Sequence, residues 1–277
     1  MIYFSMGYWV IGLALIVSVA GASCGFACIR QSTKSVTARF RLVWVFVAAS
    51  SIGGVGVAMP VFITMLGFEM RGGQLRYDTV LTTVFTVLSG VAVLAALVIA
   101  GRSVNWIRLG IGAVVMAAGI GTAHLLLLSG IQVQGSTDRS VVSLVAVYVI
   151  ALALSALMLW FSLTARSVPI LMAGAVAYAI LVLGMHYAGL TGLEVHLNGT
   201  AATPEGQALF DFFVPFFIVG SMALTIPITA ILVAPDRREA RQAPVLADPE
   251  ATHSPSLAVA SQNAAAQQGA RPAQSVR

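Results

Sequence analysis

The chain has 277 residues, of which 58% are hydrophobic and only 9% are charged, and its mean hydropathy is +0.93. This composition excludes an ordinary soluble domain, in which about a quarter of the residues carry a charge. The formal net charge of +5 is explained by basic loops flanking apolar segments, so we expect no nucleic-acid partner.

Seven apolar runs follow one another along residues 3–234, each long enough to cross a hydrocarbon core of about 30 Å. The predicted spans cover residues 3–28, 42–68, 79–100, 109–131, 140–164, 169–193 and 212–234. We therefore predict an all-α integral membrane protein, a seven-helix transmembrane bundle surrounded by the lipid bilayer.

Basic residues in the loops set the predicted orientation, because cytoplasmic loops of membrane proteins collect Lys and Arg. One set of span ends carries ten basic residues: Arg30, Lys34, Arg39, Arg41, Arg102, Arg108, Arg166, Arg237, Arg238 and Arg241. The other set carries only three: Arg71, Arg76 and Arg139. This asymmetry predicts an N-terminus outside the cell and a C-terminus in the cytoplasm.

The first predicted span contains both cysteines of the chain, Cys24 and Cys28, one helical turn apart. Two thiols alone do not complete a thiolate metal site, and disulfides seldom persist near the cytoplasm. We therefore interpret both cysteines as helix-packing residues.

The second, fourth and sixth spans share a glycine-rich pattern around a central residue. The stretches read GVGVAMPVFITMLGF at 54–68, GIGTAHLLLLSGI at 119–131 and VLGMHYAGLTGL at 182–193. Their centres, Pro60, His124 and His186, recur at the spacing of one helix pair with its loops, and all three have the same predicted depth. The pattern predicts a bundle built from repeated helix pairs, in which close packing at the glycines brings the centres together. Pro60 is also expected to kink its helix.

The two central histidines are candidate metal ligands, because ionisable residues inside membrane spans are rare and often functional. Imidazole binds copper, iron, nickel and zinc, and thioether sulfur favours Cu(I). His124 and His186, assisted by Met185 and Met59, could therefore hold one ion. Two alternatives remain: hydrogen bonding between helices with methionines filling gaps, and haem ligation by the two histidines.

Other membrane classes fit the sequence less well. A retinal photoreceptor needs a lysine inside the membrane, and the only lysine, Lys34, lies in a predicted loop. Ion-coupled transporters place charges along a pathway near the midplane, and the predicted spans contain no charged residue.

Residues 241–277 are rich in Ala, Gln, Ser and Pro and have no helical period, which predicts a disordered cytoplasmic tail. The tail contains no recognisable enzymatic or DNA-binding module. We therefore expect that the protein is not an enzyme and that any signal leaves through another protein or a homo-oligomer.

The stretch GMHYAGL at 184–190 resembles the signature of the MHYT domain, a bacterial integral-membrane sensor module. In that family a Met-His-Tyr motif occurs three times, in alternate helices of a seven-span bundle near the outer face. The resemblance covers about residues 1–240. It implies a sensor or signalling module of the cell inner membrane, with a metal, copper first of all, bound by motif His and Met residues. The ligand it implies is oxygen, carbon monoxide or nitric oxide.

The chain departs from the family pattern at several motif positions. Ala188 stands where the family has threonine, Ala123 and Leu125 replace Met and Tyr of the second motif, and Pro60 replaces the first histidine. These departures put the metal site in doubt. The alternative is a structural or partner-binding membrane protein in which the site has decayed.

Overall fold

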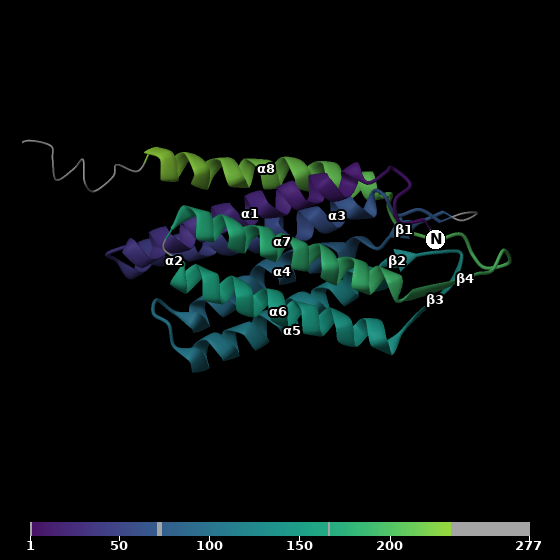
Figure 1. Cartoon of the computed structure of the whole chain (residues 1–277). Helices are drawn as coiled ribbons and strands as arrows, with labels where there is room; N and C mark the ends of the chain where they lie inside the picture. Colours follow the sequence, from purple (N-terminus) through teal and green to yellow (C-terminus); the bar gives the residue numbers. More distant parts are fainter. Residues whose placement is uncertain (1, 71–73, 166, 234–277) are drawn as a thin grey trace, which may run out of the picture. The chain divides into compact units, whose positions relative to one another are not determined.

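The computed structural model describes residues 2–70, 74–165 and 167–233, and within them seven helices are long and apolar enough to cross a membrane. This number confirms the predicted count of spans. The helices are α1 (Trp9–Lys34), α2 (Ala38–Ala49), η1 (Ser50–Ala58), α3 (Met59–Met65), α4 (Thr79–Ala100), α5 (Trp106–Ser129), α6 (Val141–Thr164), α7 (Val168–Thr191) and α8 (Leu209–Val233). Here α2, η1 and α3 form one span. Figure 1 shows the helices running alongside one another. Which membrane face each end meets stays a prediction, and the predicted tail at 241–277 lies outside the described residues.

The first helix begins at Trp9, six residues after the predicted start of its span. The residues before it pair instead with the loop after α3. The amide of Ile2 donates to the Glu69 carbonyl at 2.8 Å, and the Glu69 amide donates to the Ile2 carbonyl at 2.9 Å. Hydropathy did not indicate this difference, because the residues are apolar but their backbone groups find partners outside a helix.

The second span changes its winding where the sequence is rich in glycine. η1 is a π-helix, and the amide of Met59 donates to the carbonyl of Gly54, five residues earlier. Pro60 has no amide hydrogen to give to Gly56, its partner in an α-helical register. The Ser18 hydroxyl of α1 donates to this Gly56 carbonyl at 2.7 Å. The irregularity expected at Pro60 therefore takes the form of a π segment next to it, with a neighbouring helix supplying a hydrogen bond.

From α1 to α7, spans that follow one another in sequence pack together, and a contact between α1 and α7 joins the first span to the sixth. Glycines permit the closest approaches. A Cβ atom on Gly21 would lie 2.5 Å from the backbone nitrogen of Gly56, and one on Gly53 would lie 2.7 Å from the Cα of Gly90. These glycines therefore allow the backbones of α1, η1 and α4 to touch.

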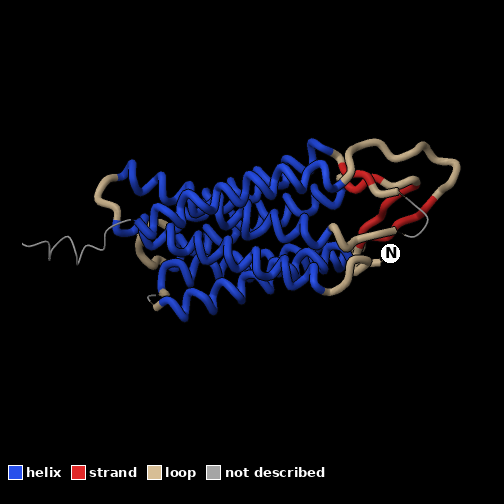
Figure 2. Tube along the Cα trace, turned by 90° about the horizontal axis from the view of Figure 1, so that it is seen from above, coloured by secondary structure: helices blue, strands red, loops and turns tan. Residues whose placement is uncertain are grey.

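The loops at one end of the bundle form short antiparallel strand pairs, which the hydropathy pattern does not predict (Figure 2). β1 (Arg76–Tyr77) pairs with β2 (Ile131–Gln132), and β3 (Gly135–Arg139) pairs with β4 (Leu193–Leu197). β2 and β3 follow α5, and β4 follows α7. The second pair therefore ties together the ends of the two helices that carry the candidate histidines.

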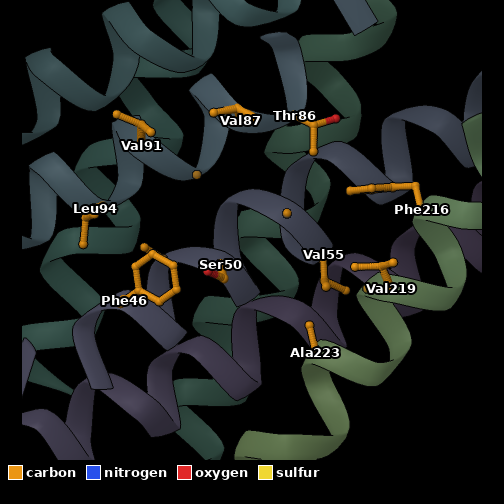
Figure 3. A pocket seen from close by; sticks show the side chains of 14 residues that line it. Phe46, Ser50, Val55, Thr86, Val87, Val91, Leu94, Phe216, Val219 and Ala223 are labelled. Atoms are coloured by element: carbon orange, nitrogen blue, oxygen red, sulfur yellow. The ribbon is translucent and has the colours of Figure 1, made fainter. Parts of the chain in front are cut away.

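The last helix, α8, lies at the edge of the bundle. Only 11% of its best span window is buried, against 28% to 61% in the other spans. Its Phe216 meets Phe62 edge to face, with ring centroids 5.3 Å apart, and the end of the Met59 side chain lies against Gly220. Beside these contacts lies an apolar hollow of about 380 Å³, toward which Val87 of α4 and Val219 of α8 point (Figure 3).

Candidate functional site

The structure brings His124 of α5 and His186 of α7 into direct contact. The Nε2 atom of His124 lies 3.0 Å from the Nδ1 atom of His186, which is a hydrogen bond between residues 62 positions apart. The rings meet edge to face, with centroids 5.3 Å apart and an interplanar angle of 88°. Both side chains are fully buried. The predicted approach of the two histidine centres is therefore present in the structure.

Gly189 makes room for this pair on α7. It lies three residues after His186, on the same side of the helix. A Cβ atom at Gly189 would lie 2.5 Å from Cε1 and 3.1 Å from Nδ1 of His124. The His124 ring therefore occupies the space that a side chain would take, so the glycine has a specific role at the site beyond general helix packing.

Neighbouring elements fix the position of α7 around the pair. The Ser143 hydroxyl of α6 donates to the carbonyl of Ala188 at 2.6 Å, within one turn of His186. Beyond the helix ends, β3 and β4 pair from Gly135 opposite Leu197 to Arg139 opposite Leu193. These contacts restrain how far α7 can slide or turn relative to its neighbours.

The hydrogen bond leaves one nitrogen on each ring without a partner. Nδ1 of His124 and Nε2 of His186 are buried and have no hydrogen-bond partner among the described residues. A neutral imidazole has one N–H and one lone pair, and the mutual bond consumes one N–H and one lone pair in total. In either tautomer the pair therefore offers one free lone pair and one free N–H at its two outer nitrogens. An unsatisfied polar atom in an apolar interior is costly, which makes these atoms candidates for ligand contact.

The donor set fits a metal ion with few protein ligands. Two nitrogens bound to one tetrahedral ion at about 2.0–2.1 Å lie about 3.3 Å apart, close to the observed separation of the hydrogen-bonded atoms. Alternatively, one histidine binds the ion through its outer nitrogen while the other orients it through the hydrogen bond, as second-shell partners commonly do. Among the described residues there is no group of three or more His, Cys, Asp and Glu that could hold a metal. Among the described residues, any further ligand would therefore be a thioether, a hydroxyl or a backbone group.

The two candidate methionines are placed differently from the histidines. The terminal methyl of Met59 lies against Gly220 of α8. Met185 is fully buried, but it directly precedes His186, and adjacent helical residues project about 100° apart. Their role as ligands stays a prediction. The third centre, Pro60, lies on α3, where its carbonyl accepts a hydrogen bond from Thr64 of the same helix at 3.0 Å.

Two tyrosines of α7, the helix that carries His186, were not predicted as site residues. Tyr187 packs on His186 with ring centroids 5.6 Å apart, and its buried hydroxyl has no partner among the described residues. Tyr178, two turns before His186, is fully buried and its hydroxyl is likewise unpartnered within the described part of the chain. The spacing of eight residues, which returns to the same helix face, was a signal in the sequence for Tyr178.

Both cysteines are free thiols buried in α1, and the Ser51 hydroxyl approaches the Cys24 sulfur at 3.7 Å. This is consistent with the packing role predicted for them. The chain matches no protein-family profile, no curated protein and no solved structure. The resemblance to the MHYT domain therefore rests on the motif residues and their spacing.

Proposed function

We propose that this chain is a signalling module of a bacterial inner membrane in which the His124–His186 pair binds one metal ion, with copper as the best match. In this proposal a diatomic gas or the availability of the metal is the sensed signal. The observation that carries it is the 3.0 Å approach of two buried imidazole nitrogens on contacting helices, with the outer nitrogen of each ring unpartnered among the described residues. The sensor role is drawn from the resemblance to the MHYT domain.

The chemistry of the pair supports copper in particular. Imidazole nitrogen binds Cu(I) and Cu(II), and the low coordination number of Cu(I) suits a site with two histidines and a buried thioether nearby. A bound copper ion would supply an electron-rich centre for a diatomic ligand. The residues of the chain hold the two imidazoles in contact, 3.0 Å apart, in the buried interior of the bundle.

A change at the pair has a direct route to helix packing. His124 and His186 lie on different helices, so a change in the spacing of their nitrogens that side-chain rotation does not absorb shifts α5 against α7. We propose that this shift is read by a protein partner or by another copy of the chain on the cytoplasmic side. No catalytic role is proposed.

The test is the metal content of the protein purified in detergent after exposure to copper, iron and zinc in parallel. His124→Ala and His186→Ala are compared with His196→Ala, a matched control because His196 is exposed in β4. The proposal expects about one copper per chain in the wild type and the control, and none in either site variant. Retained folding of the variants is checked by circular dichroism and gel filtration.

A second candidate function is favoured by the hydrogen bond itself. A direct imidazole contact of 3.0 Å is also what a purely structural cross-helix bond looks like, worth about 0.6 to 2 kcal/mol in a membrane protein. In that case the chain is a structural or partner-binding protein with a decayed site. Equal and negligible metal in the wild type and all three variants would reject the metal site and favour this second function.

A further inference from the structure

A groove between α1 and α7 has an apolar part and a part lined by basic side chains. Its apolar part is a cavity of about 550 Å³, lined by Leu15, Ile16, Val19, Ala20, Ser23, Met172, Val176 and Ile180. A second cavity of about 320 Å³ adjoins it and is lined in part by Arg30, Gln31 and Lys34. Ser23 and Met172 line both cavities, so the two form one continuous groove.

Where the two cavities meet, the side chains of Ser23 and Met172 make a weak polar contact. The Ser23 hydroxyl donates to the Met172 sulfur at 3.4 Å, on a part of the surface that faces the lipid. Ile16, Met172 and Ile180 are exposed in this groove, with 69%, 43% and 57% of their surface accessible. In a bilayer such a surface is in contact with acyl chains, since it lies within the spans.

The length of the groove matches one leaflet of a bilayer. Ile16 and Ala27 are eleven residues apart on α1, which is about 16 Å along a helix. Half of a hydrocarbon core of about 30 Å is about 15 Å. Arg30 and Lys34 follow in the next turns, at the level where a phospholipid phosphate would lie.

Among the described residues, the charged side chains at the end of the bundle that carries Arg30 and Lys34 are all basic. Arg39, Arg41, Arg102 and Arg108 lie in the loops and helix ends near Arg30 and Lys34. The six acidic residues of the described part, Glu69, Asp78, Asp138, Glu194, Glu205 and Asp211, are all at the opposite end, with the strands. The groove therefore combines an apolar channel with a mouth lined by the basic side chains of Arg30 and Lys34.

We infer that the groove between α1 and α7 binds one anionic phospholipid with a single phosphate, phosphatidylglycerol, with an acyl chain along Ile16, Ala20 and Ile180 and the phosphate at Arg30 and Lys34. Gln31 lines the same mouth and can donate a hydrogen bond from its side-chain amide. Basic pockets between membrane helices are a known type of lipid head-group site. This site is independent of the histidine pair.

The test is native mass spectrometry of the full chain, stripped of lipid in detergent and titrated with phosphatidylglycerol. In Arg30→Gln/Lys34→Gln we expect about 25-fold weaker binding, about fivefold for each cation. The matched control is Arg39→Gln/Arg41→Gln, which removes two charges from the same end outside the groove and should bind like the wild type. Equal weakening in both variants would mean that end charge alone attracts the lipid and would overturn the site.

A second variant keeps the groove testable if the charge variant does not fold. Ala20→Phe fills the apolar cavity and leaves both cations in place, so it should also weaken binding of phosphatidylglycerol. Val149→Phe, at an exposed position of α6, serves as its control. Unchanged binding in folded Ala20→Phe contradicts the proposal. Equal binding of zwitterionic phosphatidylethanolamine, or a clear preference for cardiolipin with its two phosphates, also contradicts it.

Discussion

Replacing Gly189 by alanine should break the hydrogen bond between His124 and His186, because the new side chain displaces the His124 ring. The new Cβ would lie 2.5 Å from Cε1 of His124 and 2.9 Å from Cδ1 of Leu128. Carbon atoms pack comfortably at about 3.5 Å, so the imidazole must move by roughly 1 Å. A displacement of that size away from His186 stretches the bond of 3.0 Å beyond the range of a hydrogen bond.

Three contributions determine how Gly189→Ala changes the free energy of unfolding: two lower it and one raises it. Overpacking a filled interior costs about 1–3 kcal/mol. Loss of a cross-helix hydrogen bond in a membrane costs about 0.6 kcal/mol on average. Alanine in place of glycine returns up to about 1 kcal/mol through helix propensity. We expect a net loss of about 1–3 kcal/mol in the free energy of unfolding.

Gly184→Ala is the matched control, because Gly184 lies on the same helix and a Cβ there meets nothing within 4 Å. Both variants are unfolded in detergent by titration with sodium dodecyl sulfate and followed by tryptophan fluorescence. Gly184→Ala should be as stable as the wild type or slightly more stable. If Gly189→Ala has the same stability as Gly184→Ala, the imidazole of His124 does not lie in the space beside Gly189.

Gly53→Ala should destabilise the bundle by more than about 2 kcal/mol, because its Cβ would meet the backbone of α4 at 2.7 Å. A Cβ at the neighbouring Gly54 would meet nothing within 4 Å, so Gly54→Ala is the control. The same unfolding titration compares the two variants, and similar stabilities would refute the close contact. Asp78→Ala should cost about 1 kcal/mol, since its carboxylate caps α4 by accepting an amide hydrogen bond at 2.9 Å. Ser140 begins α6 without a side-chain cap hydrogen bond, so Ser140→Ala should lose less stability than Asp78→Ala. An equal loss of stability in the two variants would argue against capping by Asp78. Burial raises the pKa of Tyr77, so the folded state holds this proton more tightly than the unfolded chain. The contribution of Tyr77 to stability should therefore be constant below about pH 10 and fall above it. Tyr77→Phe should lose less stability than the wild type between pH 9 and 11, and parallel curves would contradict the shift.

The sequence determined the number of spans and the residues worth attention at the site. Crossing a hydrocarbon core requires about 20 apolar residues in helical form, which is a property of composition along the chain and needs no tertiary contact. The repeat of about one helix pair placed His124 and His186 at the same depth on spans that run in the same direction. Their contact followed from equal depth together with glycines such as Gly189.

Tertiary structure decided the details that control chemistry. Hydropathy is insensitive to backbone pairing in loops, so neither the strands β1 to β4 nor the pairing of Ile2 with Glu69 could be predicted from it. Which nitrogens face each other, and that Met59 points to α8, depend on the rotation of each helix about its axis. Rotation is set by packing with neighbours that are distant in sequence, such as the contact of Ser18 with the π segment. A sequence pattern therefore fixes the depth of a side chain in the membrane, while its direction comes from the helices around it.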